Sequence, residues 1–275
     1  MPFPGIHKIM YRYAAKRRPL EPGKIEEIIK YGEVKAAKPS TVRFLGRIGD
    51  KGKKRPSFIE ILCLMDEKLL AIFRSEENGI PEDFTNTPPD MFSKQHYAAW
   101  VTSQVMGLEM CPITAMRHDI PRFGSGTLTG MIAGIKEVFI FDPESGKYMV
   151  DPELMYRPQS LIMNLVFNYF IGSGQRDFSS FVVDPEGNVR SRYHHEAFTF
   201  TESGRLEFIL SKMDREISSV FWNAMRQFRT IPMQFGRHRS LLRDLVSDEA
   251  ARKFAEAFYE LINDKRVGRQ TIRVI

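Results

Sequence analysis

The sequence predicts an α+β fold with a strand-rich N-terminal lobe and a mainly helical C-terminal lobe. Three observations lead to this prediction. Short apolar runs separated by turn residues fill the chain up to about residue 150. Long segments with apolar residues at helical spacing follow residue 206. Between these two regions, residues 165–200 have the pattern of a helix, a tight loop, a strand, a turn and a second strand.

Composition predicts a globular protein with a large buried core. The chain has 275 residues, of which 43% are hydrophobic and 27% are charged. It can therefore bury enough apolar surface to form a folded, globular protein. No apolar run reaches about 18 residues, so we expect no membrane span. Cys63 and Cys111 lie in apolar surroundings and are expected to be small buried hydrophobic residues. Because the first residues also lack the apolar segment of a secretory signal, we expect a cytoplasmic protein.

The charge is positive and unevenly placed. A net charge of +6 favours acidic partners such as nucleotide phosphates, nucleic acid or an anionic membrane face, without choosing among them. Basic residues crowd the first 24 positions and the loop at residues 51–55. Solvated surface charge explains either cluster. The alternative is a nucleic-acid interface, which predicts steeply salt-dependent affinity.

The first 150 residues divide into an arm and a lobe. Residues 1–40 carry five prolines around two short helical patterns, at 8–16 and 24–31, and are predicted to form a basic arm. The N-terminal lobe then spans residues 41–150. Ser93 is the expected N-cap of a helix that Gly107 ends. The strands of this lobe are predicted at residues 41–45, 58–64, 69–74, 138–141 and 147–150.

The C-terminal lobe is predicted to span residues 151–264. Its helices are expected at residues 161–171, 206–229 and 247–262, where apolar residues recur at core spacing. Ser247 precedes the last of them as a plausible N-cap. Residues 265–275 form a basic C-terminal tail that we expect to be mobile.

The central stretch carries the motifs. Glycines at 172 and 174 end the helix, and the polar loop Gln175–Asp177 follows. Phe181–Val183 is a short β-type run, and Asp184–Asn188, with Pro and Gly at turn positions, reverses the chain into a hairpin that returns towards Phe198.

This layout resembles the catalytic core of the phosphatidylinositol 3- and 4-kinase-like superfamily, most closely its small bacterial branch, whose relatives include the HipA-type kinases. In that family the loop after the helix reads roughly N-x-D-R-(H/K)-x-x-(N/H), and the returning strand ends in I-D-H-G-x-A-F. Arg176 matches the first motif, and His194, Ala197 and Phe198 match the second. The segment M-G-L-E-M-C-P-I-T at residues 106–114 also matches a family segment, L-G-(L)-x-x-(V/C)-P-x-T.

The resemblance implies a bilobal protein-kinase-like (PI3/4-kinase-like) fold with a degenerate metal site. The family's catalytic Asp falls on Gln175, its metal-binding Asn or His on Ser180, and its metal-binding Asp on Tyr193. Magnesium prefers anionic oxygen ligands, whereas an amide, a hydroxyl and a protonated phenol are neutral. We therefore expect no metal at these positions. No nucleophile elbow, zinc-protease motif or P-loop lysine is present, so hydrolase and P-loop functions lack support.

Other positions of the resemblance concern phosphate binding. Arg74 stands where the family's strand lysine holds the phosphates, and Gln95 or His96 stands where a helix Glu pairs with that lysine. Lys51 lies in a loop at the place of the phosphate-covering loop, although a plain hairpin turn explains that loop equally well. With Arg176 and His194, these residues are the candidates for holding a nucleotide or anion. The alternative for Arg74 is an exposed arginine at the end of a strand.

Two further chemical interpretations concern residues beside these motifs. Asp177 lies two residues after the expected catalytic position and is a candidate substitute base, although Val182 replaces the Asn that would bind metal with it. His194, His195 and Glu196 suggest a metal site, but alternating strand faces bring at most two of them together, and a closed zinc site needs four ligands. His194 is expected to pack or to form hydrogen bonds.

The resulting hypothesis is a pseudokinase. It would be a non-catalytic binding or scaffold protein with an unidentified protein partner, whose cleft, lined by Arg74, Gln175 and Tyr193, holds ATP, another nucleotide or an anion without Mg²⁺. The alternative is an active ATP-dependent phosphotransferase, or another nucleotidyl transferase, with a non-standard residue set. A weaker alternative is a nucleic-acid-binding protein.

Overall fold

The computed structural model describes residues 11–13, 20–44, 57–76, 91–142, 147–173, 181–191, 194, 197–200, 210–211, 216–267 and 269–275. The chain divides into two compact units. We call the first the strand unit (Met10–Tyr97 and Pro112–Ala133) and the second the helical unit (Met1–Ile9, Ala98–Cys111 and Gly134–Ile275). No helix among the described residues is long and apolar enough to cross a membrane. The lobe boundary near residue 150 stays a prediction.

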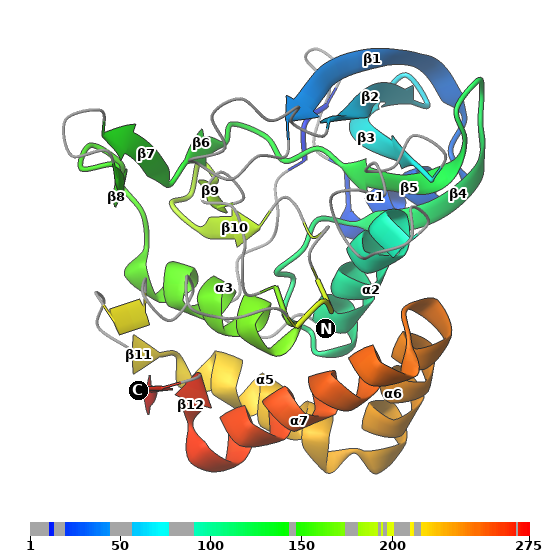
Figure 1. The fold of residues 1–275 in the computed structure, drawn as a ribbon. Coiled ribbons are helices and arrows are strands. Elements are labelled where there is room, and N and C mark those ends of the chain that lie inside the picture. The colour runs from blue at the N-terminus through cyan, green and yellow to red at the C-terminus, as the bar shows by residue number, and fades with distance from the viewer. Residues whose placement is uncertain are drawn as a thin grey trace. The chain divides into compact units, whose positions relative to one another are not determined.

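The strand unit is built on a curled five-stranded sheet with the order β1-β2-β3-β5-β4 (Figure 1). All neighbouring strands are antiparallel. The predicted strands at 58–64 and 69–74 are confirmed, and their turn places Asp66 and Glu67 at positive φ. The strands are β1 (Val34–Phe44), β2 (Ser57–Met65), β3 (Leu69–Ser75), β4 (Thr114–Ile120) and β5 (Gly124–Gly130).

Two helices were predicted in the N-terminal part of the chain, at residues 8–16 and 24–31, and the structure confirms the second. Helix α1 (Pro22–Tyr31) is confirmed; it begins with Pro at its first position and buries Ile25, Ile28 and Ile29. A helix over residues 8–16 is wrong at Tyr11 and Tyr13, which form isolated β-bridges. Tertiary contacts decide this, because the Tyr11 hydroxyl accepts a hydrogen bond from the Ile113 amide at 2.8 Å.

Helix α2 (Met91–Val105) contributes to both units. It begins two residues before Ser93, so the prediction that Ser93 caps it is wrong. The Ser93 hydroxyl lies inside the helix and donates to Glu76 Oε1 at 3.2 Å. Gly107 follows the helix at φ 68°, which confirms it as the stop. Both cysteines are free and buried, as expected.

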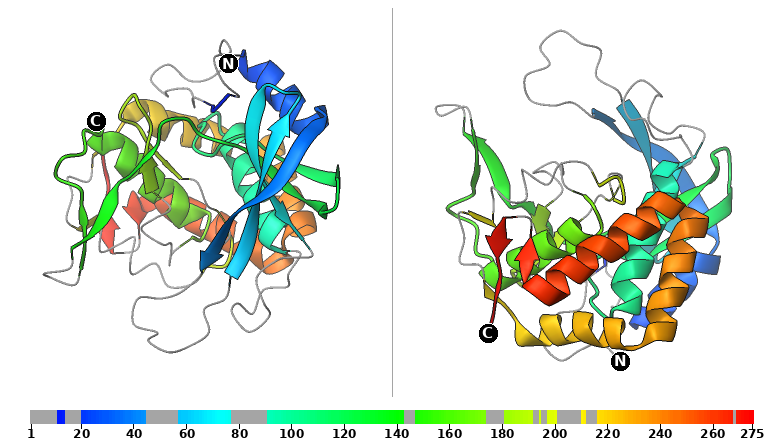
Figure 2. Two further views of the ribbon diagram at one scale, coloured as in Figure 1. Left: turned by 90° about the horizontal axis from the view of Figure 1, so that it is seen from above. Right: turned by 60° about the horizontal axis from the view of Figure 1, so that its bottom comes forward.

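Helices make up much of the described part of the helical unit (Figure 2), and aromatic side chains pack between them. These helices are α3 (Pro158–Phe170), α5 (Ser219–Thr230), α6 (Pro232–Leu245) and α7 (Asp248–Asp264). Ser247 caps α7 by accepting from the Ala250 amide, as predicted. Phe254 and Phe258 of α7 contact Phe170 of α3 edge-on, which joins the two helices through the core.

Short strands complete the helical unit. β6 (Lys136–Glu137), β9 (Phe181–Val183) and β10 (Val189–Ser191) form a three-stranded sheet. The predicted hairpin of residues 138–150 is confirmed as β7 (Phe139–Asp142) and β8 (Lys147–Val150). The central hairpin is confirmed at β9 and β10, which pair across the predicted turn. Its second strand is shorter than expected, because β10 ends at Ser191 and Ala197 and Phe198 lie in a turn.

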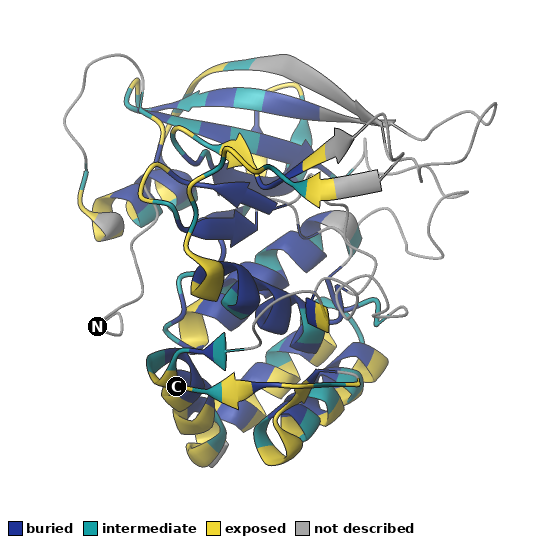
Figure 3. Cartoon of the chain, turned by 90° about the vertical axis from the view of Figure 1, so that its left-hand side faces the viewer, coloured by how far each residue is buried: buried dark blue, intermediate teal, exposed yellow. Residues whose placement is uncertain are grey.

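The end of the chain differs from the prediction. Ile217, expected in a helix over 206–229, lies in β11 (Glu216–Ile217), which pairs in parallel with β14 (Arg273–Val274). Residues of the expected mobile tail also form β12 (Arg266–Val267) and β13 (Gln270–Thr271). Long-range pairing explains both differences. Helix α6 was not predicted, although Phe235, His238 and Leu242 recur at helical spacing and are buried. Figure 3 colours buried residues dark blue and exposed residues yellow, and the helices show both colours on different faces.

Candidate functional site

The structure describes only some of the residues that the sequence marks as functional. Arg74 and Gln95 lie in the strand unit, and His194 lies in the helical unit. The candidates Lys51, Gln175, Arg176, Asp177, Ser180 and Tyr193 lie outside the described residues, as do His195 and Glu196.

Arg74 on β3 is a buried, ion-paired residue. Its Nη2 donates to Glu60 Oε1 at 2.6 Å, and its Nη1 donates to Thr129 Oγ1 at 3.4 Å. The side chains of Arg74 and Glu60 are only 3% and 4% exposed. The alternative of an exposed arginine at a strand end is therefore wrong. Arg74 joins Glu60 and Thr129 through hydrogen bonds between buried side chains of the sheet.

The sheet register explains why these groups meet. Ile61 of β2 pairs with Phe73 of β3, so Glu60 and Arg74 are the next pair along the same two strands. Arg74 also pairs with Thr127 of β5. Since residues two apart on a strand share a face, Thr129 lies on the same face as Thr127. The polar row thus comes from three neighbouring strands.

A hydroxyl pair extends this row to the edge strand. Thr114 of β4 and Thr129 of β5 are register partners, and their hydroxyl oxygens lie 3.1 Å apart. Thr114 also donates to the carbonyl of Pro112 at 3.0 Å. We call Glu60, Arg74, Thr114, Thr127 and Thr129 the sheet polar row.

Two buried oxygens in the strand unit lack a hydrogen-bond partner among the residues that the structure describes. They are Thr127 Oγ1 of the sheet polar row and Gln95 Oε1 of α2. Both residues are almost fully buried. Most buried polar atoms are hydrogen-bonded, so each exception marks a position where a bound polar group would be favourable. Gln95 is also neutral, so it cannot replace a Glu that pairs with a cation.

In the helical unit, the chain after the hairpin folds back on the end of α3. The Phe198 amide donates to the Ile171 carbonyl at 2.5 Å, and the Phe200 amide donates to the Gly172 carbonyl at 3.0 Å. Gly172, Phe198 and Phe200 have φ of 69°, 63° and 50°. Left-handed phenylalanines are unusual, and such outliers concentrate at functional positions.

His194 lies at the start of this return. It is buried, and its ring meets Phe167 of α3 edge-on with 6.3 Å between ring centroids. Its carbonyl accepts from the Ala197 amide at 3.1 Å. These contacts favour the expected packing role. In the described part of the chain, no group of three or more His, Cys, Asp and Glu residues could hold a metal ion.

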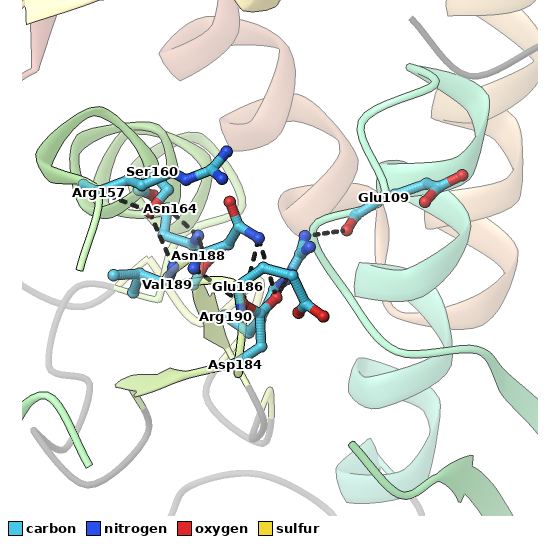
Figure 4. A network of polar contacts seen from close by, with 9 residues as sticks. All are labelled: Glu109, Arg157, Ser160, Asn164, Asp184, Glu186, Asn188, Val189 and Arg190. Carbon is cyan, nitrogen blue, oxygen red and sulfur yellow. Dashed lines mark hydrogen bonds and ion pairs between the residues drawn. The ribbon is translucent and has the colours of Figure 1, made fainter. Parts of the chain in front are cut away.

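The turn of the central hairpin contains a polar network that the sequence did not reveal (Figure 4). Asp184 Oδ1 accepts from the amides of Glu186 and Asn188 at 3.1 and 2.8 Å. Asp184 Oδ2 accepts from Arg190 Nε at 3.0 Å, and Arg190 Nη1 donates to the Glu109 carbonyl at 3.2 Å. The turn residues alone suggested only a change of chain direction.

Buried amides attach the same hairpin to α3. Asn164 Nδ2 donates to the Val189 carbonyl at 2.5 Å. Ser191 Oγ accepts from Asn168 Nδ2 and donates to Asn164 Oδ1, each at 3.0 Å. Two asparagines in an otherwise apolar helix were the available signal, because buried amides need partners. The hairpin that follows the predicted catalytic loop is therefore joined to α3 by hydrogen bonds between buried groups.

Comparison with known proteins identifies the fold. No protein-family model matches the chain, and no curated protein matches it. The chain is similar to the structure of hydra Fam20 with sugar, with a TM-score of 0.57 and 9% identity over 92% of each chain. It also matches the Golgi casein kinase at a TM-score of 0.47 and 10% identity, covering 91% of this chain and 77% of that one. The same kinase with Mn/ADP bound gives the same TM-score and identity, with 91% and 78% covered.

The likeness to Fam20 shows the fold. The protein has a protein-kinase-like fold of mixed helix and sheet content with a curled sheet. At 9% identity, a shared fold is no evidence for a shared activity.

Proposed function

We propose that this protein is a pseudokinase of the PI3/4-kinase-like type: a kinase-like protein that does not transfer phosphate and works as a binding or scaffold protein. The observation that carries this proposal is the buried pair of Arg74 and Glu60, with 2.6 Å between Nη2 and Oε1. In an active protein kinase, the strand lysine contacts the phosphates and is held by a Glu of the helix. Arg74 is instead neutralised by a carboxylate of its own sheet.

The exchange of partners lowers the positive charge offered to a phosphate. A γ-phosphate approaching Arg74 competes with the Glu60 carboxylate for the same guanidinium, and the two anions repel each other. Arg also presents a longer, planar fork than Lys, so the change is not neutral at a tight phosphate site. Gln95 of α2 stands where the family has a Glu. Because its amide is neutral, it cannot form the ion pair that joins strand and helix in an active kinase.

The proposal extends to the metal. Mg²⁺ requires anionic oxygen ligands, and the residues at the family's metal and base positions, Gln175, Ser180 and Tyr193, supply neutral groups. This donor set does not fit Mg²⁺. We therefore propose that a nucleotide or other anion is held without metal, by arginine and backbone amides.

One observation favours the second candidate, an ATP-dependent transferase with a non-standard residue set. Buried networks of Asp184, Arg190 and Asn164 hold the hairpin that follows Asp177 in the sequence. Active sites need such rigid support. Asp177 would then act as the base.

Thermal-shift titration separates the two candidates. Ligand binding to the native state raises the melting temperature by mass action. We expect ATP to give the same shift with Mg²⁺ and with EDTA, and we expect no nucleotide turnover. A magnesium-dependent shift, with turnover that vanishes in Asp177→Ala and persists in Asp244→Ala, would establish the transferase. Asp244 is a matched control because it is exposed and its ion pair is with the neighbouring Arg243.

Calorimetry adds a quantitative limit. An ATP affinity that falls about tenfold or more on removing Mg²⁺, a coupling of about 1.4 kcal/mol, would mean that a metal site exists. Gln175→Asp combined with Tyr193→Asp is expected to create metal dependence where the natural protein has none. The weaker nucleic-acid alternative predicts an affinity that falls steeply with salt.

A further inference from the structure

The corner between α5 and α6 concentrates positive charge. Helix α5 ends at Thr230 and α6 begins at Pro232, so Ile231 alone joins them. In the right-hand view of Figure 2 the two helices meet at a sharp angle. From Ile217 to Arg243 the chain contains no acidic residue and five arginines: Arg226, Arg229, Arg237, Arg239 and Arg243.

Three of these arginines are available to a partner. Arg226, Arg237 and Arg239 are exposed, and none of them forms an ion pair or hydrogen bond with a residue that the structure describes. The other two have contacts. Arg229 lies over the Tyr259 ring at 5.0 Å, and Arg243 pairs with Asp244 at 3.3 Å.

Two exposed apolar residues lie in the same stretch of the chain, between Arg229 and Arg237. Ile231 is 41% exposed and Met233 is 61% exposed. Met233 and Arg237 are four residues apart on α6 and therefore share a face. The opposite face of α6 buries Phe235, His238 and Leu242 in the core. The corner thus combines exposed apolar side chains with exposed arginines, on a helix whose other face is buried in the core.

We propose that the α5–α6 corner binds the surface of an anionic phospholipid bilayer. Arg226, Arg237 and Arg239 match the phosphate and carboxylate groups of such a surface in charge. Met233 and Ile231 then enter the headgroup region, where apolar side chains leave water. A nucleic acid would match the arginines but would leave Met233 exposed to water, and a single strand would also be expected to stack on aromatic side chains. This inference is independent of the kinase-like site.

Vesicle flotation with the full chain tests the proposal. We expect binding to vesicles that contain phosphatidylserine and no binding to pure phosphatidylcholine. Arg226→Gln and Arg237→Gln should each lower the partition coefficient about fivefold. Met233→Ser should lower it by a similar factor, since the apolar side chain no longer leaves water. All three positions are exposed, so the melting temperature should not change.

Two variants serve as matched controls. Arg252→Gln removes an exposed arginine of α7 that pairs with Glu256, and Met155→Ser removes a methionine that is 90% exposed elsewhere in the helical unit. Neither should change vesicle binding. An equal loss in these controls, or binding that persists when Arg226, Arg237 and Met233 are all replaced, would overturn the proposal.

Duplex DNA supplies the competing outcome. If the protein binds duplex DNA, loses that binding in Arg226→Gln and Arg237→Gln, and is unaffected by Met233→Ser, the corner is a nucleic-acid interface. That result, or a failure to prefer anionic vesicles, would refute the lipid assignment.

Discussion

Asp184 and Arg190 form a fully buried ion pair within one hairpin, with 3.0 Å between Oδ2 and Nε and side chains that are 0% and 3% exposed. The second carboxylate oxygen of Asp184 closes the turn by accepting from the Asn188 amide at 2.8 Å. One side chain therefore both shapes the turn and fixes the cation of the following strand. The hairpin is therefore stabilised by a buried charge pair as well as by its strand pairing.

Asp184→Asn is expected to destabilise the protein strongly. The amide keeps an oxygen for the turn but removes the carboxylate charge that faces the buried Arg190 guanidinium. Breaking a buried ion pair in this way costs about 3–5 kcal/mol. Urea unfolding measures the loss. Asp244→Asn, at an exposed position, should stay within about 0.5 kcal/mol of the natural protein. An Asp184→Asn variant as stable as this control would show that the pair is not important for folding.

Two glycine-to-alanine changes should have opposite effects on the free energy of unfolding. Gly172 has φ 69°, and a Cβ there would lie 2.7 Å from atoms of the Phe200 ring. Gly172→Ala should lose at least about 1–2 kcal/mol from the left-handed backbone alone. Gly236 is exposed in α6 with nothing within 4 Å of an added Cβ, so Gly236→Ala should gain about 0.5–1 kcal/mol. Thermal unfolding measures both, and a loss at Gly236 would contradict the argument.

Stability should fall in acid because of His238. Burial lowers its pKa from 6.5 to about 4. Its Nε2 lies 2.9 Å from Thr102 Oγ1, and Phe254 lies 5.4 Å from its ring. Above pH 6.5 the ring is neutral in both states. As the pH falls from 6.5 towards 4, the unfolded chain binds a proton that the folded protein excludes, and about 3 kcal/mol is lost.

The check is a comparison of unfolding free energies at several pH values. His238→Gln should remove this part of the pH dependence, since an amide does not titrate in this range. His118→Gln, at an exposed histidine, should leave it in place. Identical pH profiles for His238→Gln and the natural protein would refute the assignment.

Glu60→Gln should raise the affinity for ATP measured in EDTA. The change removes the carboxylate that neutralises Arg74, and one fewer opposing charge should strengthen anion binding about tenfold, or 1.4 kcal/mol. Calorimetric titration measures it. Adding Arg74→Met should abolish the gain. An unchanged affinity in Glu60→Gln would mean that Arg74 does not contact the anion.

Local patterns were sufficient for much of the fold. The alternation of β2 and β3, the proline and glycine of the 184–188 turn, and the Ser247 cap depend on neighbouring residues, so the sequence predicts them directly. The motif positions are also readable in the order of residues, and they indicate a kinase-like fold. Tyr11 and Ile217 were misassigned because their partners, Ile132 and Val274, are far away in the chain.

The sequence by itself determined that this chain mixes helices and strands, because local residue order sets the helical and strand periodicities. The neutral residues at the positions that the resemblance assigns to metal and base stay a prediction. Only the tertiary structure decided what the charged residues do. Arg74 pairs with Glu60 because two strands align them, and Asp184 holds Arg190 because both are excluded from water. Burial and strand register give such an arginine or aspartate a structural role, because a buried charge must be paired. Burial and register depend on residues far apart in the chain, so the order of residues alone does not reveal them.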